Sequence, residues 1–277
     1  MLYEFDGMKG TTLHALDGHL GKIKDLYFDD KDWKIRYLIA ETGSWFTERK
    51  VLLSPASVES VDLGDGGEVR MNLTKAQIES SPPIASDQPV SRKMETRVVQ
   101  YYNWPAYWAV PSPALGIPVM VSSPSDPQSH AQVSGTEPSG LPVPPPVEDA
   151  GLRSVEEVRG YGIRTQDGSI GYVADFICDP ETWRICYLVL DTRRVLPGSK
   201  VLLPPSIIDS VSWDSGSVSV MSTEGQIRNA PTYDDSKPID SADEAAILAH
   251  FGHGAFPAAS QRETGGVSAG SQAQHQA

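Results

Sequence analysis

Residues 17–42, DGHLGKIKDLYFDDKDWKIRYLIAET, and residues 167–192, DGSIGYVADFICDPETWRICYLVLDT, align without a gap at an offset of 150. The identities include Asp17/Asp167, Gly18/Gly168, Gly21/Gly171, Asp25/Asp175, Asp29/Asp179, Trp33/Trp183, Ile35/Ile185, Tyr37/Tyr187, Leu38/Leu188 and Thr42/Thr192. The match continues from Lys50/Lys200 to Val61/Val211, and then at an offset of 149 through Gln77/Gln226 and Glu95/Glu244. Self-similarity at a fixed spacing indicates a duplicated structural unit. The chain therefore contains the same module twice.

Each copy has the residue pattern of short β-strands. Apolar and polar residues alternate around Asp17-Gly18, and Asp-Gly between alternating runs predicts a hairpin. Further strands are predicted at 21–28, 35–41, 50–53, 60–63 and 68–73, and again at 171–178, 185–191, 200–203, 210–213 and 217–221. Pro55 and Pro205 end a strand because proline cannot donate to a ladder. The pattern favours an all-β fold with two small closed or nearly closed barrels in tandem.

A short tail with helical periodicity follows each barrel. Ser241-Ala-Asp-Glu244 predicts a helix start with Ser241 as N-cap. Ala245, Ile247, Leu248 and Phe251 are predicted to share one face, and Gly252 to end the helix. The first tail, at 97–102, is a weaker copy, and an aromatic segment follows it.

These patterns divide the chain into successive segments. We assign barrel repeat 1 to 1–82, its helix and aromatic tail to 83–108, and a flexible Pro/Ser/Gly-rich linker to 109–153. Repeat 2 is assigned to 154–231, its helical tail to 232–257, and a disordered C-terminus to 258–277. The two barrels are thus expected to move on a flexible tether.

Charge and composition exclude several kinds of partner. The formal net charge is −13, and no segment is basic, so binding to nucleic acid or to an anionic membrane is disfavoured. No apolar stretch has the length of a membrane-spanning helix, and the N-terminus lacks the pattern of a signal peptide. We expect a cytoplasmic protein without membrane insertion.

Candidate catalytic and metal-binding residues each have a simpler explanation. Cys178 and Cys186 either face each other across a hairpin or are half-buried apolar strand residues, and the second explanation is favoured. The Asp residues near the hairpins fit turn chemistry rather than a calcium loop. Asp25 and Asp175 are exceptions within strands, expected to hydrogen-bond a loop or to pair with Lys50 or Lys200. His250 and His253 approach ligand spacing, but we expect no catalytic, cofactor-binding or metal site.

The order of motifs resembles the PRC-barrel domain. Gly-Thr precedes a strand, Asp-Gly-x-x-Gly leads into the next, and a hairpin Trp, Tyr-Leu and Lys-Val-Leu-Leu-x-Pro follow. That family is named after the cytoplasmic domain of the photosynthetic reaction centre H subunit, and it recurs in a 16S rRNA maturation factor. The H subunit has a membrane anchor and the rRNA factor a different N-terminal domain. The resemblance therefore implies a tandem barrel protein, but a photosynthetic or ribosomal role only as a lesser alternative.

The aromatic segment after the first helix is the main interaction candidate. It contains Tyr101, Tyr102, Trp104, Tyr107 and Trp108. Clustered rings either form an exposed contact patch or fold back over their own barrel. We expect a non-enzymatic scaffolding protein that binds another protein or a second copy, possible homo-oligomers included, and no cofactor. A small-ligand or ion-responsive sensor is the alternative.

Overall fold

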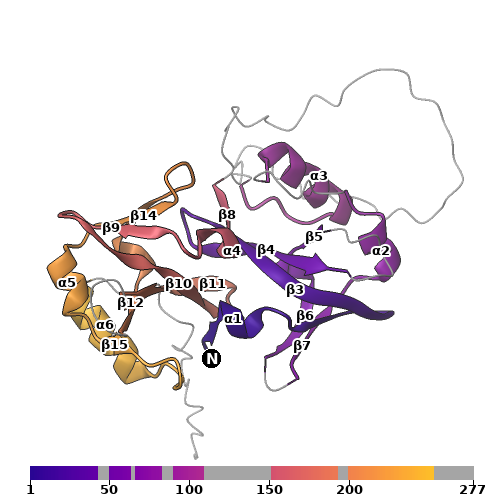
Figure 1. The fold of residues 1–277 in the computed structure, drawn as a ribbon. Coiled ribbons are helices and arrows are strands. Elements are labelled where there is room, and N and C mark those ends of the chain that lie inside the picture. Colours follow the sequence, from indigo (N-terminus) through magenta and orange to yellow (C-terminus); the bar gives the residue numbers. More distant parts are fainter. Residues whose placement is uncertain (43–49, 64–65, 83–89, 109–150, 193–198, 253–277) are drawn as a thin grey trace, which may run out of the picture. The chain divides into compact units, whose positions relative to one another are not determined.

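The computed structural model describes residues 1–42, 50–63, 66–82, 90–108, 151–192 and 199–252 (Figure 1). The chain divides into two compact units, of which one comprises Met1–Pro89 with Gly151–Ala277 and the other Val90–Ala150. Most regular structure is β-strand, which confirms the all-β prediction. The predictions for the linker at 109–150 and for the C-terminus at 258–277 lie outside the described residues.

The strands of the first repeat form one continuous path. They are β2 (Thr12–Ala15), β3 (Gly18–Asp29), β4 (Lys34–Glu41), β5 (Lys50–Leu53), β6 (Val58–Asp62) and β7 (Glu68–Met71), followed by helix α2 (Lys75–Glu79). Hydrogen bonds connect them in the order β6-β7-β2-β3-β4-β5, with β2 and β7 parallel and the other pairs antiparallel. The two ends of the path, β5 and β6, are joined by the 3₁₀ turn Pro55–Ser57, so the path turns back towards its start.

The second repeat has the same order of strands. They are β9 (Gly162–Arg164), β10 (Ser169–Asp179), β11 (Arg184–Asp191), β12 (Lys200–Leu203), β13 (Ile208–Ser212) and β14 (Ser217–Val220), followed by α5 (Glu224–Arg228). The path β13-β14-β9-β10-β11-β12 again has a parallel pair, β9 with β14. A further strand, β15 (Thr232–Tyr233), adds to β12.

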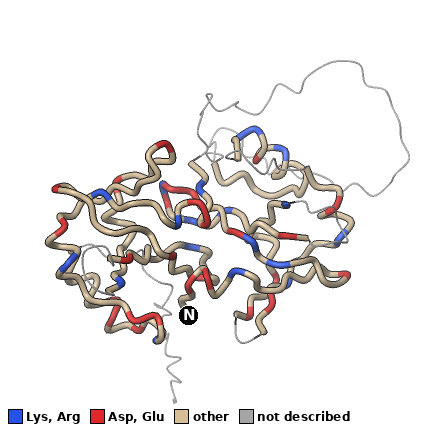
Figure 2. Tube along the Cα trace, viewed as in Figure 1, with Lys and Arg blue, Asp and Glu red and all other residues tan. Residues whose placement is uncertain are grey.

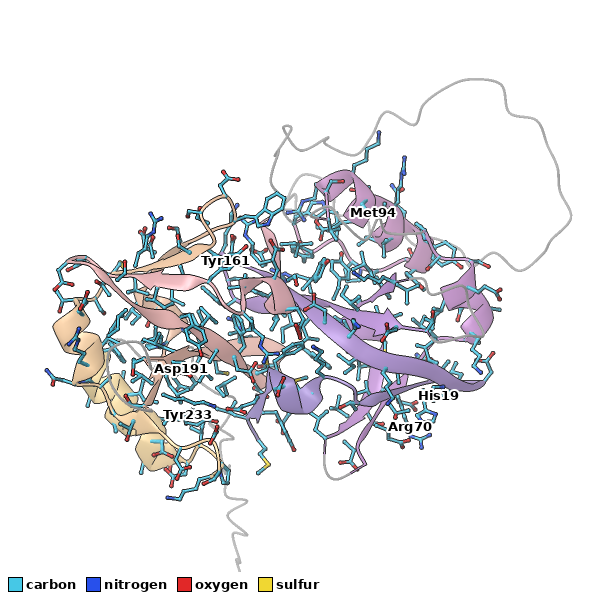
Figure 3. The ribbon with its side chains drawn as sticks, in the orientation of Figure 1. His19, Arg70, Met94, Tyr161, Asp191 and Tyr233 are labelled. Atoms are coloured by element: carbon cyan, nitrogen blue, oxygen red, sulfur yellow. The ribbon has the colours of Figure 1, made fainter. Side chains whose placement is uncertain are left out.

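A glycine shared by both repeats is required by close backbone contact. A Cβ atom at Gly21 would lie 2.1 Å from the Glu41 carbonyl oxygen, and one at Gly171 would lie 2.1 Å from that of Asp191. Figure 3 labels Asp191 in the second repeat. Only glycine permits β3 to approach β4, and β10 to approach β11, so closely.

The aspartate of the Asp-Gly turn in each repeat also accepts a hydrogen bond from the start of a helix. The Asp17 carboxylate accepts a hydrogen bond from the Lys75 amide at 2.8 Å, and Asp167 accepts one from the Glu224 amide at 2.8 Å. Both amides lie at a helix start, where backbone donors lack intrahelical partners. The aspartates thus fix α2 and α5 to the first hairpin of each repeat.

The two repeats exchange their N-terminal strands. Strand β1 (Tyr3–Glu4) of the first repeat pairs with β10 of the second, with Tyr3 opposite Cys178. Strand β8 (Leu152–Ser154) of the second repeat pairs with β3 of the first, with Arg153 opposite Phe28. The offset of 150 relates each pair to the other, so the exchange is reciprocal.

The repeats also meet at their central hairpins. Lys34 of β4 pairs with Arg184 of β11, and these are equivalent residues. The Ile35 amide donates to the Trp183 carbonyl at 2.8 Å, and the Ile185 amide donates to the Trp33 carbonyl at 2.9 Å. This contact therefore follows an approximate two-fold symmetry. Figure 1 shows β3, β4, β10 and β11 together in the middle of this unit.

Both tryptophans at this contact have left-handed backbone conformations. The φ angle is 57° at Trp33 and 55° at Trp183, where a residue other than glycine is unusual. The Trp33 ring stacks on Phe28 with a centroid separation of 5.3 Å. Packing of the large ring offsets the strain, and the turn directs the carbonyl at the other repeat.

Three expectations need correction. Leu152 and Arg153, assigned to the linker, lie in β8 because their backbone completes the edge of β3. The repeats do not move apart on a tether, because each contributes a strand to the other's sheet. Asp25 and Asp175 hydrogen-bond to the N-terminal segment of the opposite repeat instead of pairing with Lys50 or Lys200.

The helix of the second tail, α6 (Ser241–Phe251), begins one residue earlier than predicted. Its N-cap is Asp240, whose carboxylate accepts from the amides of Ala242 and Asp243, so a capping box forms with Asp243 rather than Glu244. Gly252 ends the helix at φ 71°, as predicted. Ile247 is buried, but Leu248 is 47% exposed, so the predicted apolar face is wrong in part.

The strand exchange can be tested with the native thiol of Cys178. We expect Tyr3→Cys in a Cys186→Ser background to form a disulfide with Cys178 when the chain refolds under oxidising conditions. Directly opposed residues of antiparallel strands have a Cα separation that suits a disulfide. The product should run as a cross-linked monomer on a non-reducing gel, and peptide mapping should identify the bond.

The matched control is Tyr3→Cys with Cys178→Ser, which should form no intramolecular bond. If the first variant gives only free thiols or intermolecular disulfides, β1 does not pair with β10 within one chain.

Candidate interaction surface

The aromatic segment belongs to the unit that begins at Val90. Helix α3 (Arg92–Tyr102) starts after Ser91, whose hydroxyl accepts from the Met94 amide at 3.3 Å. It is longer than the predicted helix at 97–102. Asn103 ends it in a left-handed conformation, and the Trp104 amide then donates to the Val99 carbonyl at 3.0 Å. The chain therefore turns back along α3 directly after the helix. Figure 3 labels Met94 on this helix.

The predicted rings pack in two groups. The Trp104 ring stacks on Tyr102 at 4.2 Å, and Tyr101 meets Tyr102 edge to face at 4.8 Å. In the second group, Tyr107 and Trp108 meet edge to face at 4.8 Å. Tyr101 is 40% exposed, whereas the other four rings are partly buried. Thus the segment is neither a loose exposed patch nor completely covered.

A buried carboxylate anchors the second group to the helix. The Tyr107 hydroxyl donates to Glu95 Oε1 at 2.7 Å, and Arg92 Nη1 lies 2.7 Å from Glu95 Oε2. Arg92 also donates to the Tyr107 hydroxyl at 2.9 Å, and its guanidinium lies 4.5 Å from the Trp108 ring centroid. Burial and the neighbouring Glu95 raise the pKa of Tyr107, so the phenol keeps its proton and donates.

Arg92 and Glu95 were not among the predicted site residues. The sequence contained a signal, because they are three residues apart and such pairs share a helix face. This signal was missed because the helix start was placed after them. Their ion pair fixes the direction in which the aromatic segment leaves α3.

A second cluster of buried carboxylates lies between the repeats. Asp25 Oδ2 accepts from the Ser154 hydroxyl at 2.5 Å, and its Oδ1 accepts from the Glu156 amide at 3.1 Å. These donors belong to β8 and to the short helix α4 (Val155–Val158) of the second repeat. Reciprocally, Asp175 Oδ2 accepts from the Asp6 amide at 3.1 Å, in α1 (Phe5–Met8) of the first repeat.

Two equivalent ion pairs surround these carboxylates. Lys9 lies 2.5 Å from Glu156, and Arg159 lies 3.1 Å from Asp6. Lys9 and Arg159 are related by the offset of 150, as are Asp6 and Glu156. Both ion pairs therefore join the segment that follows β1 to the segment that follows β8.

Burial raises the pKa of both aspartates to about 6. For Asp25 the Ser154 hydroxyl and two backbone amides oppose this effect, while Glu156 adds to it. For Asp175 the amides and Arg159 oppose it, while Glu4 adds to it. Each carboxyl therefore takes up a proton more readily in the folded chain than in water.

Other sequence candidates have structural roles. Cys178 and Cys186 are buried free thiols, and Cys178 lies opposite Ile185 rather than Cys186, so the facing arrangement is wrong. His250 Nε2 lies 2.8 Å from the Gln226 carbonyl oxygen, which connects α6 to α5. His253 lies outside the described residues. Within the described ranges no group of three His, Cys, Asp or Glu side chains is arranged to hold a metal ion.

The carboxylates of the hairpin turns accept local backbone bonds. Asp29, Asp32 and Asp179 each accept from the amide two residues later, at 3.0 to 3.1 Å. This is the turn chemistry expected of aspartate. No helix in the described part of the chain is both long and apolar enough to cross a membrane.

Comparison with known proteins agrees with this architecture. Residues 15–70 match the family model of the PRC-barrel domain. The chain therefore contains a PRC-barrel domain, which confirms the resemblance, and the match lies in the first repeat.

A similar protein is an uncharacterized protein of Deinococcus radiodurans. It is 29% identical over 86 residues, which cover 31% of this chain and 30% of the relative. The aligned region therefore spans less than a third of the relative's length.

The anchoring of the aromatic segment predicts the effect of removing one hydroxyl. We expect Tyr107→Phe to loosen residues 104–108 from α3, because the buried Glu95 carboxylate loses a donor at a cost of about 1–3 kcal/mol. Amide hydrogen exchange at Trp104 should accelerate. Tyr101→Phe, which alters an exposed ring on the same helix, should leave that exchange rate unchanged.

The carboxylates between the repeats predict a pH dependence of stability. From pH 7 down to pH 4 the folded chain binds protons at Asp25 and Asp175 that the unfolded chain, with an ordinary pKa of 3.8, has not yet taken up. Their contribution to the free energy of unfolding therefore rises as pH falls through about 6. At about 1.4 kcal/mol per pKa unit, this is about 3 kcal/mol for each carboxyl at most.

The double variant Asp25→Asn with Asp175→Asn should lose this contribution, since an amide does not titrate. We therefore expect the free energy of unfolding, measured with urea at pH 7 and pH 4.5, to change less favourably on acidification for the variant than for the native chain. Asp209→Asn, at an exposed position of β13, serves as control. Equal pH profiles for the native chain and the double variant would contradict the assignment.

Proposed function

We propose that this chain is a non-enzymatic binding or scaffolding protein with two PRC-type barrels that act as one rigid platform. Support for two barrels comes from the identical strand order of the repeats, of which the first contains the residues 15–70 that match the family model. The exchanged strands β1 and β8 hold the repeats together, so the platform presents its surfaces in a constant arrangement.

The observation that carries this proposal is the preorganised aromatic segment after α3. Its rings are held in place by the Arg92–Glu95–Tyr107 cluster while they keep part of their surface in solvent. Rigid aromatic side chains supply contact area with little loss of conformational entropy, and they are enriched where proteins bind one another. We therefore assign the protein contact to Tyr101, Tyr102, Trp104, Tyr107 and Trp108.

Affinity purification from the native cells tests this assignment. Trp104→Ala with Trp108→Ala should leave the fold intact by circular dichroism but lose a specific protein partner identified by mass spectrometry. Each truncation at a contact centre commonly weakens binding by about 2 kcal/mol or more. The lost partner should then bind the purified native chain directly.

The matched control is Trp213→Ala, because this tryptophan is 52% exposed in the second repeat. It should retain the partner. If the double variant and the control retain the same partners as the native chain, the aromatic segment is not the contact.

A further inference from the structure

The helices of the two tails are equal in length and lie at equivalent positions in the sequence of the two repeats. Helix α3 covers Arg92–Tyr102 and α6 covers Ser241–Phe251, so corresponding residues differ by 149 in number. Both bury the same central position, occupied by Val98 in α3 and Ile247 in α6. In α6 this residue packs against Tyr187, Val189 and Leu202 of the second repeat.

The neighbouring face is covered in α3 and open in α6. In α3, the Glu95 side chain is 0% exposed and Val99 is 8% exposed. Their counterparts in α6 are Glu244, which is only partly buried, and Leu248, which is 47% exposed. Residues four apart share a helix face, so Glu244 and Leu248 form one surface, here called the Glu244–Leu248 face.

The cover in α3 consists of specific groups. Arg92 and the Tyr107 hydroxyl bind the Glu95 carboxylate, the Trp108 ring lies over the Arg92 guanidinium, and the Trp104 amide donates to the Val99 carbonyl. This arrangement combines a cation, a hydroxyl donor and aromatic surface. It shows which chemistry satisfies a buried glutamate at this position of the helix.

At the equivalent positions the second repeat lacks these groups. The residue equivalent to Arg92 is Ser241, and those equivalent to Tyr107 and Trp108 are Phe256 and Pro257. Residues 253–257 therefore contain no Arg, Lys or Tyr side chain. Within the described part of the chain, no side chain or amide donates to that carboxylate.

The charge around this face is negative. Asp243 and Glu244 lie in the first turn of α6 after the Asp240 cap, and Figure 2 shows acidic residues gathered there. Burial raises the pKa of Glu244, which indicates that the carboxylate is partly desolvated without a compensating cation. A positively charged group would be favoured at this position.

We propose that the Glu244–Leu248 face of α6 binds a protein segment that supplies an Arg side chain next to an aromatic ring. The guanidinium pairs with Glu244, as Arg92 pairs with Glu95 on α3, and the ring covers the exposed Leu248 side chain. This site is separate from the aromatic segment of the first tail. The partner expected at this site is a peptide segment that is both cationic and aromatic.

Selection from a random peptide display library on the full chain tests the proposal. Selected peptides should be enriched in Arg adjacent to Trp or Tyr. Synthetic peptides of the selected sequences should bind the native chain in fluorescence polarisation and lose tenfold or more in affinity to Glu244→Gln. Leu248→Ser should also weaken binding, whereas Asp209→Asn should not.

A second variant tests whether the peptides bind the Glu244–Leu248 face itself or only respond to the negative charge of the chain. Ser241→Arg with Phe256→Tyr and Pro257→Trp introduces the groups that cover α3, and this covered chain should no longer bind the peptides. Trp104→Ala with Trp108→Ala should still bind them, so the outcome is independent of the function proposed for the first tail.

Three results would overturn the proposal. Selected peptides without the Arg-aromatic signature contradict it, and so do selected peptides that bind Glu244→Gln as tightly as the native chain. Selection on the native chain that yields no binding peptide also contradicts the proposal.

Discussion

The reciprocal exchange of β1 and β8 is the interaction on which the rest of this structure depends. Each strand is only two or three residues long, yet each pairs with the long strand β3 or β10 of the opposite repeat. Asp25 and Asp175 then fix the segment that follows each strand through its backbone amides. An exposed sheet edge invites unwanted pairing, and the exchange covers part of two edges at once.

This arrangement explains why certain residues are the same in both repeats. Gly21 and Gly171 permit close approach of paired strands, and Trp33 and Trp183 direct a carbonyl across the two-fold contact. The described residues of the two tails have no such role in the contact between the repeats. Arg92 has been replaced by Ser241 at the equivalent position, and the two helices consequently present different surfaces.

The sequence predicted those features that local pattern determines. Alternation, Asp-Gly and proline located the strands of each repeat, and Gly252 marked the end of α6. It could not predict the exchange, because β1 and β8 are too short for alternation and their partners lie far away in the chain. Asp25 was recognisable as unusual within a strand, but its donors are amides of the other repeat, and an amide leaves no signal in a sequence. The predicted aromatic residues do lie together, whereas the ion pair that orients them was missed with the start of α3.

The exchange also changes the meaning of the covalent connection between the repeats. Once the chain has folded, each half is retained by a strand of the other, so the peptide linkage is no longer what joins them. A protease that cuts between residues 109 and 150 would produce two fragments that remain associated, in the manner of a heterodimer. Turnover of this protein would then require unfolding, and a single cut would leave both halves in place.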